Sequence, residues 1–71
     1  MEIERVEVTL KTCKSMTDQL ESLGANIVTE KLGDQIVKKA QNNKGKTLFK
    51  AIIHSNELVL VSYPKGLFDK M

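Results

Sequence analysis

Hydrophobic and polar residues alternate over several short stretches of this 71-residue chain, a pattern typical of half-buried β-strands. The densest apolar stretch covers residues 46–64 and is rich in β-branched side chains. It is interrupted only by the polar residues His54, Ser55, Asn56 and Glu57. Such a stretch predicts a β-hairpin, with residues 47–53 paired with residues 58–63, at the centre of a small antiparallel sheet.

Residues 3–11 show the clearest alternation in the chain. Val6, Val8 and Leu10 point to one side of an extended backbone, whereas charged and polar residues point to the other. This pattern predicts a half-buried first strand.

A short helix is predicted to follow the first strand. Ser15 precedes Asp18 by three residues, a spacing that favours Ser15 as the helix N-cap. The apolar positions recur at helical spacing and form one narrow stripe: Met16, Leu20 and Leu23. Gly24 stands where a left-handed residue commonly ends a helix. Residues 25–30 then predict a second strand, which completes a β-α-β unit.

Residues 31–45 allow two interpretations. In the first, a short helix begins at Asp34 and is lined by apolar residues: Leu32, Ile36, Val37 and Ala40. In the second, residues 35–41 form a strand that turns through residues 42–45 into the central hairpin, with Gly45 at the position that needs positive φ. The sequence Asn-Asn-Lys-Gly is a strong hairpin connector, so the strand is favoured.

The predicted elements define the fold class. We expect a single α+β domain over residues 1–71, in which a β-α-β unit is followed by an antiparallel β-meander. One helix should pack on one face of a four- or five-stranded sheet.

Four stretches carry a resemblance to a known family: residues 3–12, the helix with Leu20, Leu23 and Gly24, residues 34–38, and residues 57–59. In layout, residues 3–63 resemble the chloroplast reading frame thirty-five family of small uncharacterised proteins. The resemblance implies a β-α-β unit followed by an antiparallel meander, and therefore a strand at residues 35–41. It implies no activity, and members of that family extend past the point where this chain stops.

The predicted turns sort the strand residues onto two faces. If residues 43–45 loop out and the second turn centres on Ser55 and Asn56, one apolar face forms the core beneath the helix: Val37, Phe49, Ala51, Ile53, Leu58 and Leu60. The other face then lacks a helix. Its expected partner-binding residues are Ile36, Lys38, Leu48, Lys50, Ile52, Val59, Val61 and Tyr63.

Three occupants are considered for this second face, since an apolar patch of this size is uncommon on a monomer. Leu67 and Phe68 in the tail could fold back over it. Two chains could pack it together as a homodimer. Another protein could bind it, with Tyr63 as the anchor and with Lys38 and Lys50, expected to lie opposite each other, meeting acidic groups.

Candidate chemistry is sparse. His54 and Ser55 are adjacent in a predicted turn, and turn formation explains them better than nucleophilic catalysis. Cys13, expected just before the helix, is interpreted as a packed small residue rather than a reactive thiol. One His and one Cys are too few for a metal site. We expect neither enzymatic activity nor a cofactor.

Composition limits the remaining classes. A single Cys excludes an internal disulfide and fits a cytoplasmic protein, and the charged N-terminus does not resemble a signal peptide. No apolar run is long enough to span a membrane. A net charge of +2 is too small to indicate nucleic-acid binding by itself.

The predicted function is therefore a non-enzymatic protein-interaction module, of the adaptor or inhibitor type, that uses the sheet face opposite the helix. The alternative is binding to a nucleic-acid backbone through a lysine-rich hairpin over residues 38–50. Its candidate residues are Lys38, Lys39, Lys44, Lys46 and Lys50.

Overall fold

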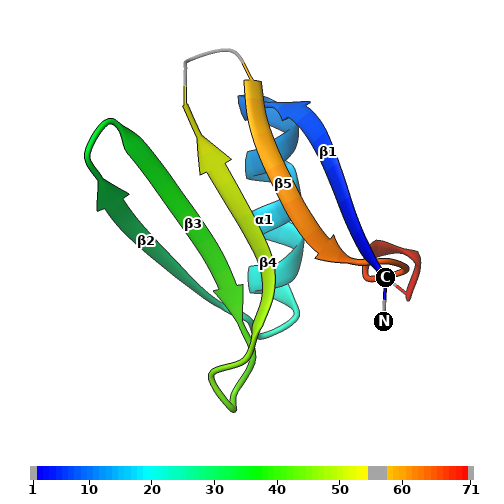
Figure 1. The fold of residues 1–71 in the computed structure, drawn as a ribbon. Helices are drawn as coiled ribbons and strands as arrows, with labels where there is room; N and C mark the ends of the chain where they lie inside the picture. The colour runs from blue at the N-terminus through cyan, green and yellow to red at the C-terminus, as the bar shows by residue number, and fades with distance from the viewer. Residues whose placement is uncertain (1, 55–57, 71) are drawn as a thin grey trace.

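The computed structural model describes residues 2–54 and 58–70 and shows one helix packed against a five-stranded antiparallel sheet (Figure 1). The elements follow the chain in this order: β1 (Ile3–Thr9), α1 (Leu10–Ser22), β2 (Asn26–Leu32), β3 (Gln35–Gln41), β4 (Thr47–Ile53), β5 (Leu58–Pro64) and the 3₁₀ turn η1 (Phe68–Lys70). The predicted α+β class, the β-α-β start and the meander are confirmed, as is the strand at residues 35–41.

The strand order is β1-β5-β4-β3-β2, so the first two strands lie at opposite edges of the sheet. Every neighbouring pair is antiparallel, and β1 and β2 therefore run in the same direction without touching. The connecting helix α1 crosses one face of the sheet between them (Figure 1). The last strand, β5, closes the sheet by inserting between β1 and β4.

The helix begins six residues earlier than predicted, because Thr9 and not Ser15 is its N-cap. The Thr9 side-chain oxygen accepts a hydrogen bond from the Thr12 backbone N–H at 3.2 Å, which satisfies one of the free donors of the first turn. The earlier start carries Cys13 and Thr17 onto the buried side of the helix together with Leu20. Leu23, expected in the apolar stripe, is the C-cap and is 66% exposed.

Gly24 ends the helix as predicted, with a φ of 99°. Its N–H donates to the Glu21 carbonyl, and the Ala25 N–H donates to the Leu20 carbonyl, both at 3.0 Å. These two bonds form a Schellman motif, which directs the chain from the helix into β2.

The β3–β4 turn forms as predicted, but a bulge just beyond it shifts the register. Gln41 pairs with Thr47, whereas Ala40 pairs with Phe49, so Leu48 is an additional residue on β4. Beyond the bulge, Ile36 lies opposite Ile53 and not opposite Ile52 as expected. A shift of one residue exchanges the two faces of a strand, and it turns β3 over relative to the prediction.

The register of β5 also differs by one residue from the prediction. Ile53 pairs with Val59, where the sequence analysis expected Leu58. The predicted turn at Ser55 and Asn56 lies outside the described residues. The pairing of β5 with β1 explains the observed register of β5, because Val8 lies opposite Val59 and Val6 lies opposite Val61. Burying these valines together completes the apolar side of β1.

The core therefore lies between α1 and the helix-facing side of the sheet. Its most buried side chains are Cys13, Leu20, Ala40, Phe49, Ala51, Val59 and Val61. The predicted core positions Phe49, Ala51 and Ile53 are confirmed on β4, whereas Val37, Leu58 and Leu60 lie on the opposite side of the sheet.

The C-terminal tail packs on the helix-facing side of the sheet. The Phe68 ring contacts those of Phe49 and Tyr63 edge to face, with centroid distances of 6.1 and 5.0 Å. Leu67 joins the same core. The expectation that Leu67 and Phe68 cover the face opposite the helix is therefore wrong, and that face stays open.

Candidate functional site

The open face, which we define as the side of the sheet away from α1, is the surface that the sequence analysis assigned to a partner. Only Lys50 and Ile52 of the eight expected residues lie on it. The other six belong to the opposite side or to the bulge: Ile36, Lys38, Leu48, Val59, Val61 and Tyr63. Val59 and Val61 are completely buried, so the predicted set is wrong as a single surface.

Two rows of side chains cross the open face from β1 to β2. The strand register aligns the first row as Glu7, Leu60, Ile52, Val37 and Glu30. It aligns the second row as Arg5, Ser62, Lys50, Lys39 and Val28. The first row is apolar in its centre and acidic at both ends, and the second row is mostly basic. These rows lie side by side across all five strands.

The exposed apolar side chains of the open face lie along β1 and β5 at one edge and, at the other edge, on β2, where Leu32 is 59% exposed. Ile3 is 47% exposed, Leu58 is 48% exposed and Leu60 is 39% exposed. Leu58 and Leu60 also line a hollow with Glu7 at its rim. We call these three residues, together with Ile52, the open-face patch. They are large aliphatic side chains on a sheet face that no described helix covers, which is the usual property of a contact surface.

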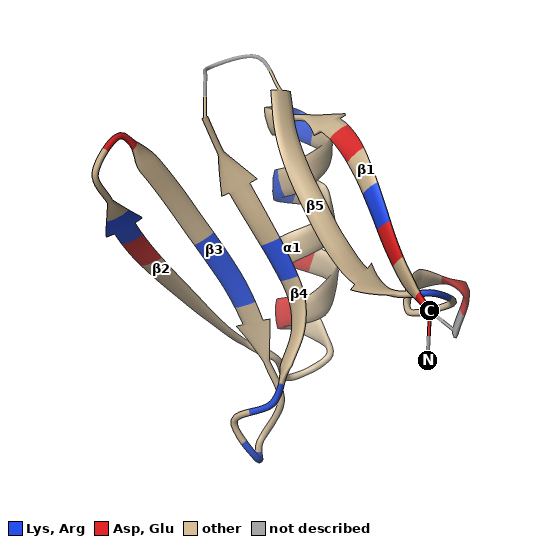
Figure 2. Ribbon diagram, in the orientation of Figure 1, with Lys and Arg blue, Asp and Glu red and all other residues tan. Residues whose placement is uncertain are grey.

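The charges of the open face are arranged by the register and not by sequence proximity. Lys39 lies directly opposite Lys50, and the pair Lys38–Lys50 expected from the sequence does not form because Lys38 lies opposite Ala51. Lys39 is 3.4 Å from the Glu30 carboxylate, which relieves its repulsion with Lys50. Figure 2 shows the basic bands on β3 and β4 and the alternating acidic and basic residues along β1.

The five lysines of the alternative interpretation do not share one face. Lys38 points toward the helix side, where it lines a hollow with Cys13, whereas Lys39 and Lys50 lie on the open face. Lys44 and Lys46 belong to the β3–β4 turn at the end of the sheet (Figure 2). A phosphate backbone following this hairpin would meet the lysines on two sides of the sheet.

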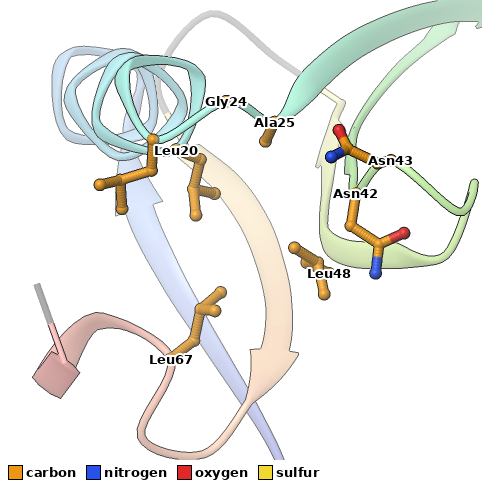
Figure 3. A pocket seen from close by; sticks show the side chains of 8 residues that line it. Leu20, Gly24, Ala25, Asn42, Asn43, Leu48 and Leu67 are labelled. Atoms are coloured by element: carbon orange, nitrogen blue, oxygen red, sulfur yellow. The ribbon is translucent and has the colours of Figure 1, made fainter.

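A second hollow, of about 320 Å³, lies where the helix ends (Figure 3). Its walls are mainly apolar: Leu20, Leu23, Ala25, Leu48 and Leu67, with Asn42 and Asn43 at its edge. The Asn42 side-chain oxygen accepts the backbone N–H groups of Lys44 and Lys46 at 2.9 and 3.0 Å, so this residue holds the turn. No acid, base or nucleophile lines the hollow, and its mainly apolar walls suit an apolar group.

Cys13 is a packed core residue, as the sequence analysis favoured, although it lies inside the helix and not before it. Its side chain is 3% exposed. Burial raises the pKa of the Cys13 thiol, and the positive charge of Lys38 opposes part of that shift. A buried neutral thiol is a poor nucleophile.

Other chemistry is not assembled in the described part of the chain. His54 is exposed and lies 3.3 Å from the Gln35 side-chain nitrogen through its Nε2, while its sequence neighbour Ser55 lies outside the described residues. Within residues 2–54 and 58–70, no three His, Cys, Asp or Glu side chains are grouped as metal ligands.

Comparison with protein-family models, with curated proteins and with solved structures finds no match for this chain. The resemblance of residues 3–63 to the chloroplast reading frame thirty-five family therefore stays a prediction. In the described chain, no helix has the length and apolar character needed to cross a membrane.

The residues of the open-face patch other than Ile52 were missed by sequence reasoning. The signal that could have found them is the alternation of the first strand. Val6 and Val8 must face the helix, and the strand beside β1 must offer them apolar partners. If Val59 and Val61 are assigned as these apolar partners, the alternation of the strand predicts that Leu58 and Leu60 face outward.

Proposed function

We propose that this chain is a non-enzymatic protein-interaction module that binds through the open face of its sheet. The observation that supports the proposal is the position of Leu58 and Leu60. Both point away from the core although their neighbours Val59 and Val61 are fully buried. The solvent-facing side of an antiparallel sheet usually carries polar residues. The internal strand β5 instead has leucines on its outer side.

The surroundings of the patch fit a protein better than a nucleic acid. Glu7 and Glu30 stand at the two ends of the apolar row and would repel phosphates. The patch offers aliphatic contact area for a protein core, with basic groups in the neighbouring row to orient a partner. It offers no aromatic ring on which a base could stack.

Retention of a partner from an extract of the encoding organism tests this proposal. Immobilised wild-type chain should retain a protein in stoichiometric amount, and Leu60→Asp should lose it, because a charge would be placed in an apolar contact. Leu10→Asp is the matched control, since Leu10 is 38% exposed, close to the 39% of Leu60, and starts the helix on the other side of the sheet.

Two outcomes would contradict the proposal. In one, Leu60→Asp retains the same protein as the wild type. In the other, the wild type retains no protein and is also monomeric. Replacing Lys44 and Lys46 with Glu in a salt-dependent gel shift tests the alternative. A shift by the wild type that this variant loses would favour nucleic-acid binding.

A further inference from the structure

The open face carries a pattern of charges that complements itself, and this points to a particular partner. Ile3 and Pro64 lie opposite each other at one end of the β1–β5 ribbon, and Thr9 and Leu58 lie opposite each other at the other end. Between these ends, Arg5 and Glu7 stand two residues apart on β1 and face the same side of the sheet.

We infer that the open face binds a second copy of this chain, with Glu7 of each copy opposite Arg5 of the other. This inference rests on the proposed function, because it assigns an occupant to the same surface. The two sheets would pack face to face. The two-fold axis would lie between the sheets and run across the strands, midway between the row that contains Arg5 and the row that contains Glu7. An axis in this position places the Arg5 row of each copy over the Glu7 row of the other copy.

The arrangement matches apolar groups as well as charges. The end of the β1–β5 ribbon that carries Ile3 and Pro64 in one copy would lie over the end that carries Leu58 in the other copy. Leu60 would lie over Ser62, a small residue that leaves room for it. On β4, the aliphatic stem of Lys50 would cover Ile52 of the other copy. On β3, Lys39 would lie over Val37, which its own chain already buries. No like charges meet in these contacts.

Other two-fold arrangements are less favourable. An axis along the strands between β4 and β5 would bring Arg5 over Lys39 of the second copy, a repulsive contact. An axis through the Glu7 row would place Glu7 over its own equivalent. The charges of the open face therefore select the arrangement in which the two rows exchange.

The size of the face sets the expected strength. Strands lie about 4.8 Å apart and rise about 3.3 Å per residue, so five seven-residue strands offer a face of roughly 500 Å² on each copy. Two such faces bury roughly 1,000 Å², which is near the lower limit for a specific interface. We expect a reversible dimer whose population depends on concentration in the micromolar range.

Sedimentation equilibrium and light scattering of the full chain, from about 1 μM to about 1 mM, test the inference. The wild type should pass from monomer to dimer. Leu60→Asp should stay monomeric, while Leu10→Asp should dimerise like the wild type. Circular dichroism should show the same fold for all three.

Charge exchange tests the orientation. Glu7→Arg and Arg5→Glu should each weaken the dimer about tenfold or more, since two opposite-charge contacts become repulsive in each dimer. An equimolar mixture of the two variants should form a heterodimer with wild-type affinity, and the double variant R5E/E7R should recover the homodimer. Glu21→Arg, on an exposed position of the helix, should have no effect.

Three results would overturn the inference. The first is a wild type that is monomeric at every concentration. The second is a dimer that Leu60→Asp leaves unchanged. The third is a failure of the mixture and of the double variant to recover association. The wild type could instead be monomeric and still retain a foreign protein that Leu60→Asp fails to retain. That result would rule out the dimer but support the proposed function, so the two failures are distinguishable.

Discussion

Ile53 on β4 lies directly opposite Val59 on β5, and this pairing decides which side of β5 is buried. With Ile53 facing the helix, Val59 and Val61 face it too, and both are completely buried. Leu58 and Leu60 are consequently turned outward. A shift of one residue would bury the leucines and expose the valines, together with Tyr63.

The two sides of β5 should respond very differently to truncation. Val59→Ala removes two buried methyl groups and should lower the free energy of unfolding by about 2 kcal/mol. Leu60→Ala, on the open face, should change it by less than about 0.5 kcal/mol. Urea denaturation of dilute protein, where the chain is monomeric, measures both. Equal losses in the two variants would contradict the observed register.

The tail should contribute measurably to stability through its aromatic contacts. Phe68→Ala removes the ring that meets Phe49 and Tyr63 edge to face, and should lower the free energy of unfolding by about 1–3 kcal/mol. For a domain of this size, each 1 kcal/mol corresponds to about 4–8 °C in Tm. Asp69→Ala, at the exposed neighbouring residue, is the control and should leave Tm nearly unchanged. A Phe68→Ala variant as stable as this control would show that the tail is not docked.

Substitution of Gly24 should lower the free energy of unfolding because of the backbone conformation of this residue alone. Its φ of 99° lies in a region that side chains avoid, and a Cβ atom built there has no neighbour within 4 Å. Gly24→Ala should therefore cost about 1–2 kcal/mol of strain without any clash. Gly24→Asn should cost less, since Asn tolerates the left-handed region better. Thermal denaturation followed by circular dichroism compares the two, and equal stability of Gly24→Ala and the wild type would count against the Schellman motif.

Cys13 should make stability decrease in alkaline solution. Burial raises the pKa of its thiol above the ordinary value of 9.0, with Lys38 opposing part of the shift, so the folded chain retains a proton that the unfolded chain releases. The contribution is complete below the unfolded pKa and is lost as the pH rises through the folded one. The difference in unfolding free energy between wild type and Cys13→Ala should thus be constant up to about pH 8 and shrink above about pH 9.

Urea denaturation between about pH 7 and about pH 10.5 checks this difference, since the remaining titrations are common to both chains. The Cys13 thiol should also react more slowly with a disulfide reagent in native than in denaturing buffer. A difference that stays constant through the alkaline range would contradict the burial of a neutral thiol.

Local patterns in the sequence predicted the type and order of the helix and the strands, but not where the helix begins. Alternation predicted β1, Gly24 marked the end of the helix, and the Asn-Asn-Lys-Gly turn joined β3 to β4. Each of these features depends on residues that are close in the sequence, so backbone geometry and short-range hydrogen bonds determine it. The helix start was predicted wrongly because Thr9 and Ser15 are both acceptable caps, and the choice depends on which helix face the sheet can cover.

The candidate surface, by contrast, was decided by the tertiary structure. The bulge at Leu48 and the pairing of β5 with β1 each shift a strand by one residue, and each shift reverses two faces that are similarly apolar in the sequence. Sequence alone showed that the sheet has more apolar surface than one helix can cover. Which side chains remain outside depended on the contact of Val6 and Val8 with Val61 and Val59, because strands distant in the sequence must bury their apolar sides together.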